Sequence, residues 1–209
     1  PDDIVAQIKA SGGSASAETL DISDREAVMA FGGRMVEQYG KIDVLVNNAG
    51  IAPRIRPNDP DQMQKWDQVI NVNLTGQWDI TVALLPALKH AGASVIFVSS
   101  IAGFTAPRSS AAYGASKAAV RSLVQYFART LGPTGGRANG LAPGRMKSDL
   151  MMVTGEAGEK FLERVPLGRV GELGPGAGHD AGQQRRRPHL GGHDRDVQPF
   201  AQGRFEADA

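Results

Sequence analysis

Two kinds of apolar pattern alternate along the chain and predict its secondary structure. Apolar residues spaced three or four positions apart predict amphipathic helices, and short unbroken apolar runs predict buried strands. In chain order the predicted elements are the end of a helix at 4–10, a helix at 25–39, a strand beginning at Val44, a helix at 60–89, a strand at 93–98, a helix at 111–131 and a weaker strand at 137–141. This alternation predicts the α/β class, with a doubly wound parallel sheet and helices on both faces.

The long helix predicted at 60–89 contains residues that a regular helix disfavours. Asn73 lies in its middle, where an asparagine side chain competes with the helix for backbone hydrogen bonds. Pro86 predicts a kink near the end. An asparagine in mid-helix indicates a special role, for which Asn71 is the nearest competitor, and a plain solvent-facing side chain is the ordinary interpretation of either.

Tyr113 and Lys117 share one helical face, because residues four apart in a helix lie one above the other. A phenol has a reference pKa of about 10, and an ammonium group beside it favours the phenolate. Ser100 follows the strand at 93–98, so its hydroxyl can face the phenol from a strand end. These three groups can hold a carbonyl oxygen by two hydrogen bonds while a hydride arrives at its carbon. Taken singly, the pair is more typical of a helix surface and the serine of a cap.

Two further motifs follow predicted strands. Asn-Asn-Ala-Gly at 47–50 offers small residues at which a nucleotide can approach the backbone, and its asparagines can tie neighbouring strands together. After the strand at 137–141, Pro143 fixes its backbone angle and Gly144 permits a sharp turn. With Asn73 and the Ser, Tyr and Lys described above, these motifs make residues 2–169 resemble the short-chain dehydrogenase/reductase family, in particular its ketoacyl-acyl-carrier-protein reductase branch.

The resemblance implies an oxidoreductase that moves a hydride between NAD or NADP and an alcohol or ketone. Tyr113 would exchange the hydroxyl proton and Ser100 would orient the substrate oxygen. Lys117 would lower the pKa of the phenol and bond the nicotinamide ribose, and Asn73 would hold a relay water. The residues implied to contact the cofactor are Asp21, Ile22, Asn48, Ala49, Gly50, Tyr113, Lys117, Pro143, Gly144, Met146 and Ser148.

Asp21 has two interpretations that the local sequence does not separate. The resemblance places it at the end of a further strand, where the family contacts adenine. It can equally help to cap the helix at 25–39, for which Ser23 or Asp24 is the predicted N-cap.

The resemblance also predicts what this chain lacks. It begins after the family's first βαβ unit, so we expect residues 1–170 to form an incomplete Rossmann-like domain without the phosphate-binding loop. Residues 171–209 contain few large apolar side chains and predict an irregular tail. A second hypothesis follows, a catalytically inactive fragment that keeps the fold and its oligomer surfaces, with Trp78 and Tyr126 as interface residues.

Composition narrows the possible partners. The chain has 209 residues with 23 basic and 22 acidic side chains, and a formal net charge of +1 gives no electrostatic case for nucleic acid or an anionic membrane. No apolar run is long enough to span a bilayer, and no amino-terminal targeting signal is visible. The absence of Cys excludes disulfides and is compatible with the cytoplasm. We expect a small alcohol or ketone substrate, a homo-oligomer (dimer or tetramer) and no metal, because the tail histidines His179, His189 and His193 are more typical of solvated residues.

Overall fold

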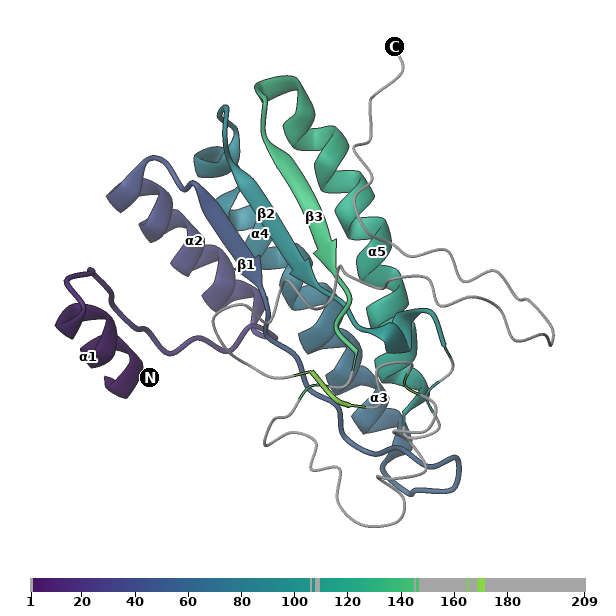
Figure 1. Cartoon of the computed structure of the whole chain (residues 1–209). Helices are drawn as coiled ribbons and strands as arrows, with labels where there is room; N and C mark the ends of the chain where they lie inside the picture. Colours follow the sequence, from purple (N-terminus) through teal and green to yellow (C-terminus); the bar gives the residue numbers. More distant parts are fainter. Residues whose placement is uncertain are drawn as a thin grey trace.

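The computed structural model contains a three-stranded parallel sheet with helices packed against it (Figure 1). It describes residues 2–105, 107, 110–144, 146, 165 and 169–171. The strands are β1 (Val44–Asn47), β2 (Ser94–Val98) and β3 (Arg137–Leu141), in the order β1-β2-β3. The α-helices are α1 (Asp2–Ala10), α2 (Arg25–Tyr39), α3 (Gln62–Ile70), α4 (Gly76–Leu88) and α5 (Ala111–Leu131).

Side-chain caps fix where the two best-predicted helices begin. The Asp24 carboxylate accepts a hydrogen bond from the Ala27 backbone N–H at 3.0 Å, so Asp24, and not Ser23, is the N-cap of α2. The Ser110 hydroxyl accepts from the Tyr113 N–H at 3.3 Å and caps α5. This cap places Tyr113 in the first turn of α5, beside the carboxyl ends of the strands.

Helices α2, α4 and α5 contribute to one apolar core against one face of the sheet; in Figure 1, α4 lies behind the strands, with α2 beside β1 and α5 beside β3. Alternate strand residues point into this core, among them Phe97, whose ring stacks on Phe127 of α5 at 5.7 Å between centroids. The residues between them point the other way: Val44, Val46 and Leu141 are each more than half exposed. The described helices that form the core therefore all cover the same face.

The helix predicted at 60–89 is a continuous run with an irregular turn in its middle. After α3, a five-residue π-helix spans Asn71–Thr75 and leads directly into α4. A π-turn widens the helix and rotates the following residues, and such turns are frequent at functional sites. The irregularity thus lies at Asn73, while Pro86 remains within the last turn of α4.

Close approach explains one of the two glycines inside α2. A Cβ built on Gly32 would lie 2.4 Å from the Cβ of Ala83 on α4, so only glycine lets the two helices come this near. A Cβ on the adjacent Gly33 would meet nothing within 4 Å.

The strand expected to end at Asp21 is not formed. The residues from Gly13 to Asp21 do not form a strand, and β1 is the edge strand of the described sheet. The Asp21 carboxylate instead accepts hydrogen bonds from the Ser23 N–H at 2.9 Å and the Ser23 hydroxyl at 2.7 Å. Asp21 therefore stabilises a turn before α2 and does not cap the helix.

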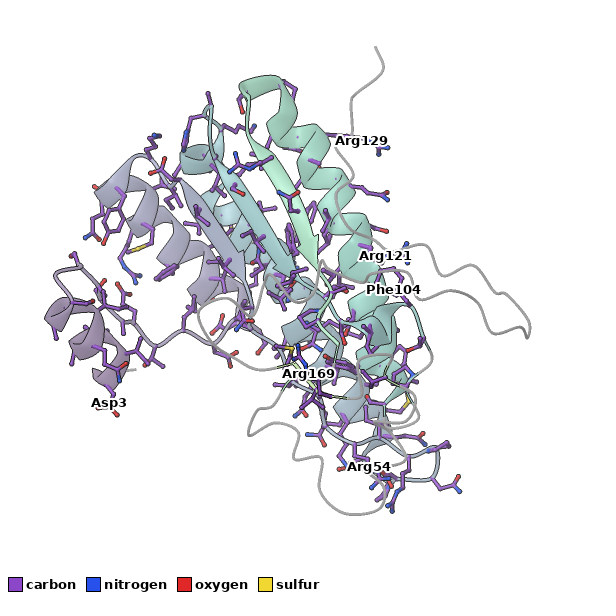
Figure 2. All side chains as sticks on the ribbon, in the orientation of Figure 1. Asp3, Arg54, Phe104, Arg121, Arg129 and Arg169 are labelled. Carbon is purple, nitrogen blue, oxygen red and sulfur yellow. The ribbon has the colours of Figure 1, made fainter. Side chains whose placement is uncertain are left out.

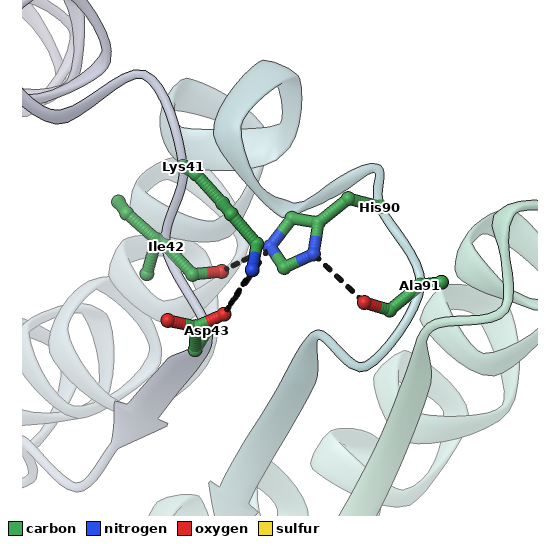
Figure 3. A network of polar contacts seen from close by, with 5 residues as sticks. All are labelled: Lys41, Ile42, Asp43, His90 and Ala91. Atoms are coloured by element: carbon green, nitrogen blue, oxygen red, sulfur yellow. Dashed lines mark hydrogen bonds and ion pairs between the residues drawn. The ribbon is translucent and has the colours of Figure 1, made fainter.

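Polar contacts at the opposite, amino-terminal edge of the sheet join the loops that precede β1 and β2 (Figure 3). The two ring nitrogens of His90 lie 3.0 Å from the Ala91 carbonyl oxygen and 2.9 Å from that of Ile42. Nearby, Lys41 and Asp43 form an ion pair at 2.9 Å, and the hydrogen bond from Lys41 lowers the pKa of the Asp43 carboxyl. The contact of His90 with Ile42 joins the two loops, and the ion pair of Lys41 and Asp43 lies within the loop before β1.

Candidate active site

The carboxyl ends of the three strands bring together the segments that carry the predicted site residues. The Ile101 N–H, just after Ser100, donates to the Pro143 carbonyl at 3.1 Å, which links the loops after β2 and β3. The Asn-Asn-Ala-Gly loop reaches the same place: a Cβ on Gly50 would lie 3.3 Å from Asn73 Oδ1 and 3.4 Å from Lys117 Nζ. Five segments far apart in the sequence therefore lie at the carboxyl ends of the strands: the loops after the three strands, the helix at Asn73 and α5 at Lys117.

Asn73 fastens the loop after Gly50 to the helix. Its Oδ1 accepts from the Ile51 N–H at 2.7 Å, and its Nδ2 donates to the Ile51 carbonyl at 2.9 Å and to the Ser116 hydroxyl at 3.2 Å. The side chain is fully buried, so these bonds satisfy a polar group that would otherwise be costly. Asn71 instead lines an open cavity together with Asp21 and Ile51, so the two asparagines that the sequence left as competitors have different surroundings.

Lys117 carries a buried charge. The residue is only 3% exposed, and its Nζ donates to the Val98 carbonyl at 2.7 Å and lies 5.8 Å from the centroid of the Tyr113 ring. Burial disfavours the charged form and lowers the pKa of the Lys117 ammonium from 10.5 to about 8. None of the described carboxylates forms an ion pair with it. The amine and the phenol thus lie together, as the helical spacing predicts.

Ser100 caps a short turn and also has a hydroxyl hydrogen that it can donate. Its Oγ accepts from the Ala102 N–H at 3.2 Å and caps a short 3₁₀ turn, Ile101–Gly103. That turn sits directly on α5, because a Cβ on Gly103 would lie 2.7 Å from the Lys117 carbonyl oxygen. The hydroxyl hydrogen of Ser100 has no acceptor among the described residues, so it remains available to a ligand oxygen.

An open cavity of about 370 Å³ is lined by the turn at Asp21 and by Ile51, the residue that Asn73 holds. Its lining residues are Asp21, Ser23, Ile51, Gln68, Asn71 and Val72. The hydrogen bond from the Ser23 hydroxyl, followed by that from the Ser23 N–H, lowers the pKa of the Asp21 carboxyl and keeps it anionic. A negative acceptor at the wall of such a cavity suits a ligand that presents amino or hydroxyl donors.

Several residues that support the site were not predicted. The Ser99 hydroxyl donates to the Lys117 carbonyl at 2.7 Å, and the Ser116 hydroxyl donates to the Tyr113 carbonyl at 2.9 Å. Fully buried Gln77 donates through Nε2 to the Ala49 carbonyl at 3.2 Å. Its position four residues after Asn73, as a polar residue on an apolar helix, was the signal that could have found it.

The remaining residues of the predicted motifs lie in different surroundings. Asn47 donates to Thr81 of α4 at 3.0 Å, so this asparagine ties its strand to a helix and not to a neighbouring strand as expected. Among the described residues, a Cβ on Gly144 would meet no atom within 4 Å, which leaves the backbone on this side open to a ligand. Met146 forms an isolated parallel bridge with Gly171. Ser148 and residues 172–209 lie outside the described residues.

Figure 2 shows Phe104 and Arg121 together beside the loop that follows Ser100. The Arg121 guanidinium lies 4.4 Å from the centroid of the Phe104 ring, a distance typical of a cation–π contact. Arg54 lies far from this pair, at the lower end of the molecule in the same view. Within the described residues no cluster of His, Asp or Glu could hold a metal ion, and no helix is long and apolar enough to cross a membrane.

Comparisons with known proteins agree with the geometry. The family model for short chain dehydrogenase matches residues 1–158. A trans-4-hydroxycyclohexanecarboxylate dehydrogenase from Sinomonas cyclohexanicum is 40% identical over 154 residues, which are 73% of this chain and 57% of that protein. The 3-oxoacyl-acyl-carrier-protein reductase FabG of Thermotoga maritima is 35% identical over 176 residues, covering 82% of this chain and 70% of that protein. The chain thus spans little more than half the length of the first relative.

Among solved structures, a short chain dehydrogenase from Burkholderia cenocepacia J2315 in complex with NADP is 30% identical in sequence. Its TM-score is 0.73, and the match covers 82% of this chain and 69% of that one.

Proposed function

Because the chain belongs to the short-chain dehydrogenase/reductase family, we propose that the protein transfers a hydride between NAD or NADP and an alcohol or ketone. The observation that carries the proposal is the meeting of Gly50, Asn73 and Lys117 at the carboxyl edge of the sheet, with the lysine charge buried beside Tyr113. In parallel α/β folds this edge is where ligands bind.

The comparisons confirm the predicted family, with its resemblance to the ketoacyl-acyl-carrier-protein reductase branch, and the Rossmann-like α/β fold. They also confirm, for the family, the class of oxidoreductase that uses a nicotinamide dinucleotide. They do not favour the second hypothesis, an inactive fragment.

The proposed chemistry uses the groups at the strand ends. In oxidation of an alcohol, the hydroxyl proton passes to the Tyr113 phenolate while Ser100 donates a hydrogen bond to the same oxygen. The positive charge of Lys117 stabilises the phenolate. Asn73 holds the Ile51 segment beside Lys117, where the relay water implied by the family would stand. A bound nicotinamide would accept the hydride.

For the cofactor, we assign the adenosine half to the cavity lined by Asp21 and Ser23, with Ile22 beside them. The Asn48, Ala49 and Gly50 loop would contact the centre of the dinucleotide. The nicotinamide half is assigned to Tyr113, Lys117, Pro143, Gly144, Met146 and Ser148. The open space at Gly144 supports a close approach of the ring to the backbone.

We further propose that the protein is a cytoplasmic homo-oligomer, a dimer or a tetramer. The Trp78 and Tyr126 rings lie 5.3 Å apart on α4 and α5, and Tyr126 is 52% exposed, which supports a contact surface there. The absence of Cys is compatible with a reducing compartment.

Replacement of the phenol tests the proposed function. Tyr113→Phe removes only the phenolic hydroxyl and keeps the ring, so turnover of an alcohol panel with NAD⁺ and NADP⁺ should fall about 10²- to 10⁴-fold while cofactor binding persists. Tyr126→Phe makes the same chemical change on the exposed outer face of α5 and should keep full activity. Retention of most activity by Tyr113→Phe would exclude the phenol as the acid and base.

A further inference from the structure

One stretch of helix contacts three of the segments that the proposed function assigns to the cofactor. The contacting pairs are Asn73 with Ile51, Gly76 with Ile22, and Gln77 with Ala49. The three helix residues are spaced three and one apart, so they share one face of the helix as it leaves the π-turn. The cofactor segments are therefore joined to one another through this helix.

Gly76 provides the closest of these contacts. A Cβ built on Gly76 would lie 2.5 Å from the Ile22 carbonyl oxygen and 2.8 Å from Ile22 Cγ1. The first of these atoms is backbone, so no rotamer change could make room for a side chain, and the Asp21 turn would have to move away. The turn that carries Asp21 thus packs directly against the helix at Gly76.

Asp79 of the same helix holds the chain just after this turn, at the start of α2. It lies three residues after Gly76, on the same helical face, and its side chain is only 8% exposed. Asp79 Oδ2 accepts a hydrogen bond from Arg25 Nε at 2.9 Å, and Arg25 is the first residue of α2, four positions after Asp21. The turn is therefore fixed at Ile22 by contact and at Arg25 by an ion pair.

These contacts set the separation of the two walls of the cavity. Asp21 and Ser23 line the cavity from the turn before α2, and Ile51 lines it from the loop after β1; these two segments are called its walls below. Asn73 fixes the Ile51 wall with hydrogen bonds of 2.7 and 2.9 Å, and Gly76 and Asp79 fix the Asp21 wall. Both walls are thus attached to one continuous helical segment, which makes the cavity width a property of that helix.

We propose that Gly76 and Asp79 are positioning residues that hold the Asp21 turn at the separation from Ile51 that the adenosine half of the dinucleotide requires. This inference rests on the proposed function, because it takes the cavity as the adenosine site. Neither residue needs to touch the reacting atoms.

The test compares ligands that do and do not contain adenosine. In Gly76→Ala, the dissociation constants of NADH, NADPH and 5′-AMP should rise about tenfold or more, because small displacements of binding groups are costly. The constant for reduced nicotinamide mononucleotide, which lacks adenosine, should stay unchanged. The KM for the dinucleotide should rise while kcat at saturation is kept. Asp79→Asn, which preserves volume and removes the charge, should change the same ligands in the same direction by a smaller factor.

Two glycines of α2 supply matched controls. Gly33→Ala places its Cβ in open space, and Gly32→Ala disturbs the contact between α2 and α4 at Ala83, away from the Asp21 turn. Neither should change adenosine binding selectively. Three results would overturn the inference. Gly32→Ala could weaken the binding of adenosine ligands as much as Gly76→Ala does. Alternatively, Gly76→Ala could weaken the binding of reduced nicotinamide mononucleotide as much as that of 5′-AMP, or could have no effect on any of these ligands. If Gly76→Ala does not fold, Asp79→Asn decides by the same criteria. If the unaltered chain binds none of the probes, the proposed function itself fails and the inference fails with it.

Discussion

The two edges of the sheet use similar polar residues for opposite purposes. At the amino-terminal edge, Lys41 is 60% exposed and pairs with the carboxylate of Asp43 at 2.9 Å, and both ring nitrogens of His90 face backbone carbonyls. At the carboxyl-terminal edge, Lys117 is 3% exposed and donates to a carbonyl, without an ion pair to any described carboxylate. The exposed Lys41 charge is paired with a carboxylate of its own loop, whereas the buried Lys117 charge, without a counterion among the described residues, remains available to a ligand. The candidate site thus differs from the opposite edge by the burial of its lysine and by the lack of an ion pair to any described carboxylate, and not by the presence of a lysine.

The sharpest test of this contrast exchanges each lysine for methionine. Lys117→Met removes the charge that stabilises the phenolate, so kcat should fall about 10²- to 10⁴-fold. Lys41→Met removes an equal charge at the other edge and should leave kcat unchanged. Steady-state rates with saturating alcohol and cofactor measure both effects, and comparable losses in the two variants would abolish the distinction between the edges.

The same lysine should make stability depend on pH. Its folded-state pKa of about 8 lies below the ordinary 10.5, so the unfolded chain binds more protons between these values. The cost of burying the charge is therefore complete below about pH 8 and is relieved as pH rises towards 10.5. Relative to Lys117→Met, the unaltered chain should gain up to about 3 kcal/mol in unfolding free energy over this range.

Chemical denaturation of the two proteins at pH 7 and pH 10.5 would measure this difference. Lys41→Met, whose lysine is exposed, is the control and should show no comparable change. A constant difference between the unaltered chain and Lys117→Met across the range would contradict the buried charge.

A smaller effect is expected from His90→Ala at the amino-terminal edge. The change leaves the Ile42 and Ala91 carbonyls without the imidazole, which should cost about 1 to 2 kcal/mol of unfolding free energy. Activity of the folded protein should not change, because the loops before β1 and β2 are at the end of the sheet opposite the site. A lowered kcat with unaltered stability would place His90 in the chemistry instead.

The smallest effect should come from Asp43→Asn. An exposed ion pair contributes about 0 to 1 kcal/mol, so loss of the Lys41 contact should scarcely change the denaturation midpoint, and salt should remove what difference there is. A salt-independent loss of several kcal/mol would show that this network is stronger than exposed pairs usually are.

Much of the fold was predictable because its signals are local. The bounds of α2, α5 and β3 follow from apolar spacing and from caps such as Asp24 and Ser110. The pairing of Tyr113 with Lys117 follows from helix geometry. The predicted strand that ends at Asp21 failed because a strand is defined by its partner, and no periodicity in 19–21 reveals whether a partner is present.

The supporting contacts of the site were less accessible to prediction, because they join residues distant in sequence. Asn73 was noticed for its poor helix propensity, but its partners Ile51 and Ser116 depend on how the helix crosses the strand ends. The irregular turn lies at Asn71–Thr75, around the asparagine whose poor helix propensity marks this part of the sequence, and Pro86 remains within α4. The contact between Gly76 and Ile22 likewise exists only after α4 has packed.

The sheet face opposite the helices has a practical consequence for handling the chain. Val44, Val46 and Leu141 place an apolar strip in water, and each square ångström of such surface carries a hydration cost of about 25 cal/mol. With a formal net charge of only +1, repulsion between molecules offers little colloidal protection. Concentrated solutions should therefore scatter light more than dilute ones, and a mild detergent that wets the strip should clear them.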